Sequence, residues 1–178
     1  MADGKEVETA PKNRVVAIGI DGSENSKYAF KFYVDHIRTA NDKVYLIHAV
    51  EVNSVLHSTQ WYSSPYAFDR EVLLKLLEEE KDKIKCKLEH FAVLLKEAGI
   101  DGTVKSIHAE NPGIGICKAA EEISAAIIIV GTRGLSKLRR TFMGSVSDYV
   151  LHHAHVPVLV CRHESDEHHH HHKQHKDK

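Results

Sequence analysis

The sequence is poor in cysteine, has no long apolar run and carries almost no net charge. Its three cysteines, Cys86, Cys117 and Cys161, are odd in number and form no Cys-x-x-Cys pair, which argues against a disulfide framework or a zinc site. We expect reduced, mostly buried thiols, with Cys161 packing at the end of an apolar strand. No stretch of about 18 apolar residues is present, so no membrane span is predicted. The net charge of −1 provides no global basic field for nucleic acid.

Both ends of the chain differ in composition from the part between them. Residues 1–13 are polar and lack the apolar core of a signal peptide, so we expect a disordered leader and a cytoplasmic protein. Residues 163–178 include five consecutive histidines from His168 to His172. This tail is either a purification tag or a native segment that binds zinc or nickel loosely. The remaining residues, 14–162, are expected to form one domain.

The most informative stretch, residues 126–162, has the pattern strand, loop, helix, strand. Residues 127–130 are a run of β-branched apolar residues, which is typical of a strand buried on both faces of a parallel sheet. Gly131 ends the run, Gly134 follows, and Gly144 and Ser145 begin the next helical pattern. Helix N-termini present unpaired N–H groups to anions, and glycines allow close backbone approach. The pattern fits a phosphate site, although a plain glycine-rich turn would explain the glycines alone.

The rest of the chain alternates strands and helices. Strands are predicted at 14–20, 44–50, 103–109, 127–130 and 156–161. Helices are predicted after a cap at Ser23 or Asn25 and up to about Arg38, at 66–98 with Gly99 as its C-cap, at 114–124, and from about residue 145. This alternation predicts a parallel α/β sheet with right-handed crossovers. We predict the strand order 3-2-1-4-5. The first and fourth strands then flank the topological switch point, where ligands bind in such sheets.

Three features of the chain have competing interpretations. Asp21 ends the first strand and could bind ribose hydroxyls or a magnesium-bound phosphate, or it could form an Asx-turn with its own backbone. His48, at the end of a buried strand, is interpreted as a core residue and not as a catalytic one. Residues 51–65, with the single tryptophan Trp61, show no period. They could form a lid, a binding loop that covers a nucleotide or anchors a partner, or a mobile segment.

The spacing Gly131, two residues, Gly134, nine residues, Gly144-Ser145 resembles the nucleotide-binding signature of the universal stress protein family, in its ATP-binding branch. The apolar strand before Gly131, the final strand around Pro157 and the opening at 15–29 are similar as well. The resemblance covers roughly residues 14–162. It implies a Rossmann-like, doubly wound, five-stranded parallel sheet with helices on both faces.

The resemblance also implies which residues hold the adenine and ribose of ATP. The backbone around Ile20 and Asp21, together with Ala49, would hold this half of the ligand. Val130 and Gly131 would approach it from the other side of the crevice. A magnesium ion could bridge the phosphates near the Asp21 carboxylate.

The phosphates are expected at the start of the following helix. By the same resemblance, Gly134, Gly144, Ser145 and Val146 would bind them through backbone N–H groups and the Ser145 hydroxyl. Arg133 could add charge-assisted hydrogen bonds. Further cations in the loop would raise the local positive potential.

Three functions follow from this site. The first is an ATP-binding stress-response or signalling protein with at most slow hydrolysis. The second is a magnesium-dependent ATP hydrolase or phosphotransfer enzyme, and the third is a dimeric interaction module with a vestigial site. The absence of a Gly-Lys-Ser/Thr sequence and of an evident general base favours the first. A flavodoxin-like carrier fits the glycine spacing less well. Family dimers pair their final strands edge to edge, which implies a homodimer through Val156–Cys161.

Overall fold

The computed structural model describes residues 13–51, 70–132 and 143–162 of the 178 in the chain. The predicted leader and tail, most of the 51–65 loop with Trp61, and the basic loop with Arg133 and Gly134 lie outside these ranges.

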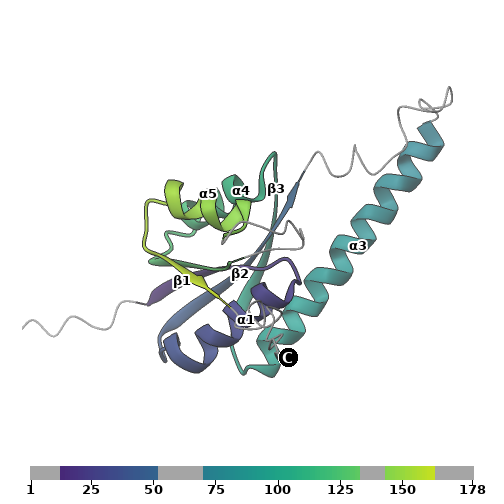
Figure 1. Ribbon diagram of the computed structural model, residues 1–178. Coiled ribbons are helices and arrows are strands. Elements are labelled where there is room, and N and C mark those ends of the chain that lie inside the picture. Colours follow the sequence, from purple (N-terminus) through teal and green to yellow (C-terminus); the bar gives the residue numbers. More distant parts are fainter. Residues whose placement is uncertain (1–12, 52–69, 133–142, 163–178) are drawn as a thin grey trace, which may run out of the picture.

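The elements follow one another as a repeated strand–helix pattern (Figure 1). They are β1 (Arg14–Gly19), α1 (Glu24–Phe32), the π-helical turn η1 (Tyr33–Ile37), β2 (Asp42–Glu51), α3 (Arg70–Glu97), β3 (Gly102–Ala109), α4 (Pro112–Glu122), β4 (Ile127–Gly131), α5 (Ser145–His153) and β5 (Val158–Cys161). The five strands form one parallel sheet in the order β3-β2-β1-β4-β5. This confirms the predicted doubly wound, Rossmann-like fold and its strand order.

Helices cover both faces of the sheet, so the inner strands are apolar on both sides. In β1, Val16 and Ile18 belong to the core shared with α1 and α3, whereas Ala17 belongs to the core shared with α4 and α5. All three side chains are fully buried. Burial on both faces explains the continuous apolar runs of the sequence, because alternate residues point to opposite faces.

α3 is the longest helix, and its outer half extends past the sheet (Figure 1). Near its C-terminus, Phe91 and Leu95 are buried in the first core, while Leu74 is 54% exposed. Gly99, with φ of +60°, ends the helix. The Ile100 N–H donates to the Leu95 carbonyl at 2.9 Å, which is the hydrogen bond of a Schellman cap. The predicted glycine C-cap is therefore confirmed.

Several element boundaries differ from the sequence prediction. The helix expected up to Arg38 is α-helical only to Phe32 and continues as η1. α4 begins at Pro112, two residues before the predicted start, because Asn111 caps it by accepting a hydrogen bond from the Gly113 N–H at 2.7 Å. Proline is well suited to a first helical position, since no N–H is needed there. The last strand begins at Val158, after Pro157.

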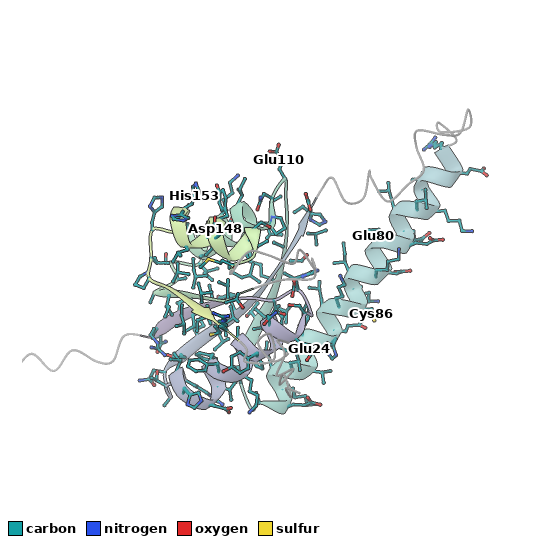
Figure 2. The ribbon with its side chains drawn as sticks, viewed as in Figure 1. Glu24, Glu80, Cys86, Glu110, Asp148 and His153 are labelled. Carbon is teal, nitrogen blue, oxygen red and sulfur yellow. The ribbon has the colours of Figure 1, made fainter. Side chains whose placement is uncertain are left out.

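The cysteines agree with the expectation of mostly buried thiols, since two of the three are buried. Cys117 and Cys161 are buried, and burial raises the pKa of the Cys161 thiol to about 11. Cys86 is the exposed one and lies on α3 (Figure 2). Among the described helices, none combines the length and apolar character required to cross a bilayer.

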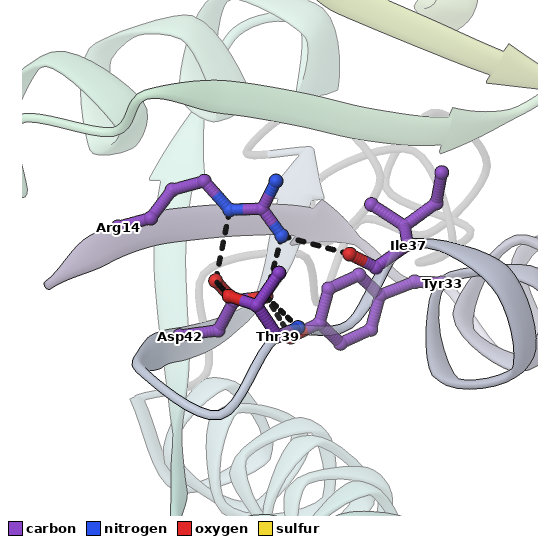
Figure 3. A network of polar contacts seen from close by, with 5 residues as sticks. All are labelled: Arg14, Tyr33, Ile37, Thr39 and Asp42. Carbon is purple, nitrogen blue, oxygen red and sulfur yellow. Dashed lines mark hydrogen bonds and ion pairs between the residues drawn. The ribbon is translucent and has the colours of Figure 1, made fainter. Parts of the chain in front are cut away.

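A polar network ties the starts of β1 and β2 together, at the end of the sheet opposite the strand carboxyl ends (Figure 3). The Asp42 carboxylate accepts hydrogen bonds from Arg14 Nε at 2.8 Å and Arg14 Nη2 at 2.6 Å. It also accepts from Tyr33 Oη at 2.9 Å, Thr39 N at 2.9 Å and Thr39 Oγ1 at 2.6 Å. Burial alone would raise the pKa of Asp42, but these donors outweigh it and hold that pKa well below its usual range.

Candidate nucleotide site

A cavity of about 420 Å³ lies where the carboxyl ends of β1, β2 and β4 meet the start of α5. β1 pairs with β2 on one side and with β4 on the other, so this is the switch point of the sheet. All eight predicted site residues that the structure describes line the cavity. They are Ile20, Asp21, Ala49, Val130, Gly131, Gly144, Ser145 and Val146. The sequence prediction therefore brought together residues from four separate segments, and their role in binding stays a prediction.

Asp21 stands at the turn between β1 and α1, where it lines the cavity and forms the Asx-turn that was one of its two interpretations. Its Oδ1 accepts a hydrogen bond from the Ser23 N–H at 2.9 Å, which is an Asx-turn. Ser23 then caps α1 by accepting from the Ser26 N–H at 3.2 Å. Gly22 between them has φ of +88°, which glycine adopts without steric cost. The Asx-turn fixes the carboxylate at the edge of the cavity, so the two interpretations are compatible.

Gly131 has a packing role that the sequence pattern did not show. A Cβ built on it would lie 2.5 Å from the backbone oxygen of Asn25 in the first turn of α1. The absence of a side chain therefore allows the end of β4 to contact α1 directly. Gly131 brings the two sides of the crevice together as well as lining it.

The first turn of α5 forms the end of the cavity at which phosphates are expected. Gly144 is its N-cap residue, and Ser145 is exposed at the first helical position. The first N–H groups of a helix have no partner within the helix, so they are available to an anion. Buried Ser147 holds this turn in place, because its Oγ lies 2.9 Å from the carbonyl oxygens of both Thr132 and Gly144. The sequence analysis missed Ser147, which only the folded turn reveals.

His48 is a buried, hydrogen-bonded residue beside the cavity. Its Nδ1 lies 3.0 Å from the Ile20 carbonyl oxygen, and a carbonyl can only accept, so Nδ1 carries the proton in this contact. Burial lowers the pKa of His48 and favours the neutral ring. The ring also meets Phe91 of α3 edge-on, at 5.5 Å between centroids. The structure agrees with the core interpretation and shows that His48 ties the ends of β1 and β2 together.

Two further segments line the cavity that the sequence analysis did not include. α3 contributes Glu80, Ile84 and Lys87, and the turn into α4 contributes Asn111 and Pro112. The spacing i, i+4, i+7 places the three α3 residues on one helix face, which is a signal present in the sequence. That this face turns to the cavity depends on how α3 packs, and the glycine signature carries no information about it.

Comparison with known proteins agrees with the family resemblance found in the sequence. The model of the universal stress protein family matches residues 12–162. The universal stress protein PHOS34 of Arabidopsis thaliana is 31% identical over 170 residues, which cover 89% of this chain and 65% of that protein. The chain thus spans about two thirds of the length of this relative.

Solved structures of the family share the fold. Universal stress protein UspA from Lactobacillus plantarum superposes with a TM-score of 0.64 at 20% identity, over 84% of this chain and 98% of that one. A universal stress protein family protein from Arabidopsis thaliana, solved with AMP bound, gives a TM-score of 0.58 at 22% identity, over 86% and 94% of the two chains. With the family model matched over most of its length, the chain belongs to the universal stress protein family.

Proposed function

We propose that this protein binds ATP, or a related adenine nucleotide, in the cavity at the switch point and acts as a stress-response or signalling protein. The observation that carries the proposal is the convergence of eight predicted site residues on one cavity. A volume of about 420 Å³ lies in the range of small-molecule sites. The structural relative with AMP bound gives further support.

The ligand is expected to lie across the crevice. Adenine and ribose would lie against Ile20, Asp21 and Ala49, and the phosphates against the first turn of α5. Arg133 and Gly134, outside the described residues, are proposed to complete the phosphate end.

Magnesium is proposed to enter with the nucleotide. Magnesium usually keeps several waters and binds through substrate phosphates and one or two carboxylates. Asp21 supplies such a carboxylate at the cavity edge. Within the described ranges, no group of three or more His, Cys, Asp and Glu side chains could hold a metal by itself. The residues present therefore fit a phosphate-bound ion better than a resident one.

Calorimetric titration of Mg-ATP into the full chain tests the proposal. Micromolar affinity, about −8 kcal/mol, is expected for the wild type, and Gly144→Val should abolish it by placing a side chain at the phosphate end. Absence of both heat and a thermal shift in a folded wild-type protein would refute nucleotide binding and favour the interaction module. Phosphate release in the same samples separates a binding protein from a hydrolase, since the binding protein should show little or no turnover.

The homodimer through the final strand and a cytoplasmic location also stay predictions. Within the described residues β5 pairs only with β4, so its other edge is available for a second copy of the chain.

A further inference from the structure

The middle of α3 forms a wall of the nucleotide cavity. Glu80, Ile84 and Lys87 lie on one face of this helix and line the cavity together with the ends of β1 and β2. None of the three belongs to the glycine signature. A ligand in this cavity would contact α3 as well as the sheet.

Lys87 differs in charge from the other charged side chains that line the cavity. Asp21, Glu51 and Glu80 are carboxylates, whereas Lys87 is the one cation among the described lining residues. Glu80 already accepts a hydrogen bond from Lys83 Nζ at 3.4 Å. Within the described part of the chain, Lys87 has no ion pair. Its ammonium has three donors and no acceptor, so it can bind a ligand atom without first breaking a contact.

The position of Lys87 along α3 places it beside the adenine and ribose half of the proposed site. Phe91, one helical turn further on, contacts the ring of His48. His48 in turn holds the carbonyl of Ile20. The charge of Lys87 acts on His48, where it adds to the effect of burial in lowering the pKa of that ring. These contacts associate Lys87 with the ends of β1 and β2, which precede the expected base and ribose positions.

We propose that Lys87 is a further ligand-binding residue of this site and donates a hydrogen bond to the base or ribose of the bound nucleotide. Adenine ring nitrogens and ribose hydroxyl oxygens are acceptors that match a lysine donor, and Ile84 adds apolar surface beside it. The inference rests on the proposed nucleotide binding and extends it from the sheet to α3.

Titration of adenosine, AMP and Mg-ATP into four full-length proteins tests the inference. These are the wild type, Lys87→Gln, Lys87→Arg and the control Lys85→Gln. Lys85 is exposed, lies on the opposite side of α3 and does not line the cavity. Both glutamine variants replace a lysine, so they change the net charge equally, and only Lys87→Gln changes the cavity. Lys87→Gln should weaken the binding of all three ligands about tenfold, because a shorter and neutral amide replaces the charged donor. Lys87→Arg should recover most of the affinity, and Lys85→Gln should bind like the wild type.

The outcomes separate this inference from the proposed function. If the wild type binds the ligands and Lys87→Gln binds them equally well, the role of Lys87 is refuted and the proposed nucleotide site is not affected. Equal losses in both glutamine variants refute it too, because they indicate a general charge effect. A loss that appears for AMP and ATP but not for adenosine shows a phosphate contact and overturns the assignment to base and ribose. A folded wild type that binds none of the ligands refutes both proposals. Thermal melting of each variant checks that the fold is kept.

Discussion

At the scale of single residues, Asp42 shows how one buried carboxylate fixes the start of two strands. Its side chain is 1% exposed, and that of its partner Arg14 is 34% exposed. Replacing Asp42 by asparagine leaves the guanidinium without its counter-ion and removes an acceptor for Tyr33 and Thr39. We expect Asp42→Asn to lower the free energy of unfolding by about 2–3 kcal/mol, near the lower end for a broken buried pair because Arg14 keeps contact with water. Urea denaturation at neutral pH measures this loss.

The same substitution should change the acid dependence of stability. The folded-state pKa of Asp42 is lowered from an ordinary value of 3.8. The contribution of Asp42 is therefore present at neutral pH and decreases as the pH falls below about 5, because the unfolded chain takes up the proton first. Denaturation series between pH 7 and pH 2 should show a smaller decrease for Asp42→Asn than for the wild type. Asp35→Asn, at an exposed ion pair with Lys31, is the control and should change little. Parallel curves for the wild type and Asp42→Asn would contradict this account.

Gly131 shows what a residue pattern can and cannot predict. Its position after a β-branched run marked both the end of a strand and a candidate ligand site, and the structure places it at the cavity. The reason that only glycine fits includes the nearby backbone of Asn25. That contact joins residues more than one hundred positions apart, so it could not be predicted from the local sequence.

At the scale of elements, the first turn of α5 holds two serines in different environments, and we predict different roles for them. Both serines line the cavity, but Ser145 is exposed, whereas Ser147 is buried against the carbonyls of Thr132 and Gly144. We expect Ser147→Ala to lower the free energy of unfolding by about 1 kcal/mol, the usual contribution of such a hydrogen bond. Ser145→Ala should leave the free energy of unfolding nearly unchanged and weaken the binding of Mg-ATP.

Urea denaturation and nucleotide titration of both variants distinguish the two roles. Equal loss of stability in both variants would show that Ser145 also holds the turn. A Ser147→Ala protein as stable as the wild type would show that the buried hydroxyl contributes nothing measurable.

The elements that the sequence predicted well are those whose signal is local. Apolar runs marked β1, β2, β4 and β5, one of the two candidate caps, Ser23, marked the start of α1, and Gly99 marked the end of α3. The π-helical turn η1 has no comparable local signal, since Tyr33 and Ile37 continue the helical spacing. The contribution of α3 to the cavity was also missed, because it depends on Phe91 packing against His48. The local pattern thus predicts elements better than it predicts which faces converge on a site.

At the scale of the whole molecule, two cores on opposite faces of one sheet leave the switch point open for a ligand. Alternate side chains of β1 belong to the two cores. α1 and α5 begin near the carboxyl ends of β1 and β4. The resemblance to the family implied this fold. A parallel sheet with the strand order 3-2-1-4-5 creates only one crevice of this kind. The cavity follows from the topology, and its chemistry follows from the residues at the strand ends.

The proposed homodimer through the open edge of β5 can be tested by removing one backbone N–H from that edge. The Pro157 carbonyl accepts a hydrogen bond from Ile128 N of β4, and the Cys161 carbonyl accepts one from Thr132 N, directly after β4. Because backbone groups alternate in direction along a strand, Val160 points its N–H away from β4 and toward the open edge. Val160→Pro should therefore remove an edge donor without removing a hydrogen bond to β4, and proline is tolerated at edge positions of this kind.

Light scattering on purified full-length protein should show a dimer for the wild type and a monomer for Val160→Pro at tens of micromolar. Val160→Ala is the matched control, because it shortens the side chain but keeps the N–H, and it should remain a dimer. If both variants become monomers, side-chain packing and not strand pairing joins the subunits. If Val160→Pro stays a folded dimer, or the wild type is a monomer, the final strand is not the interface, and its exposed edge must be tolerated because β5 is only four residues long.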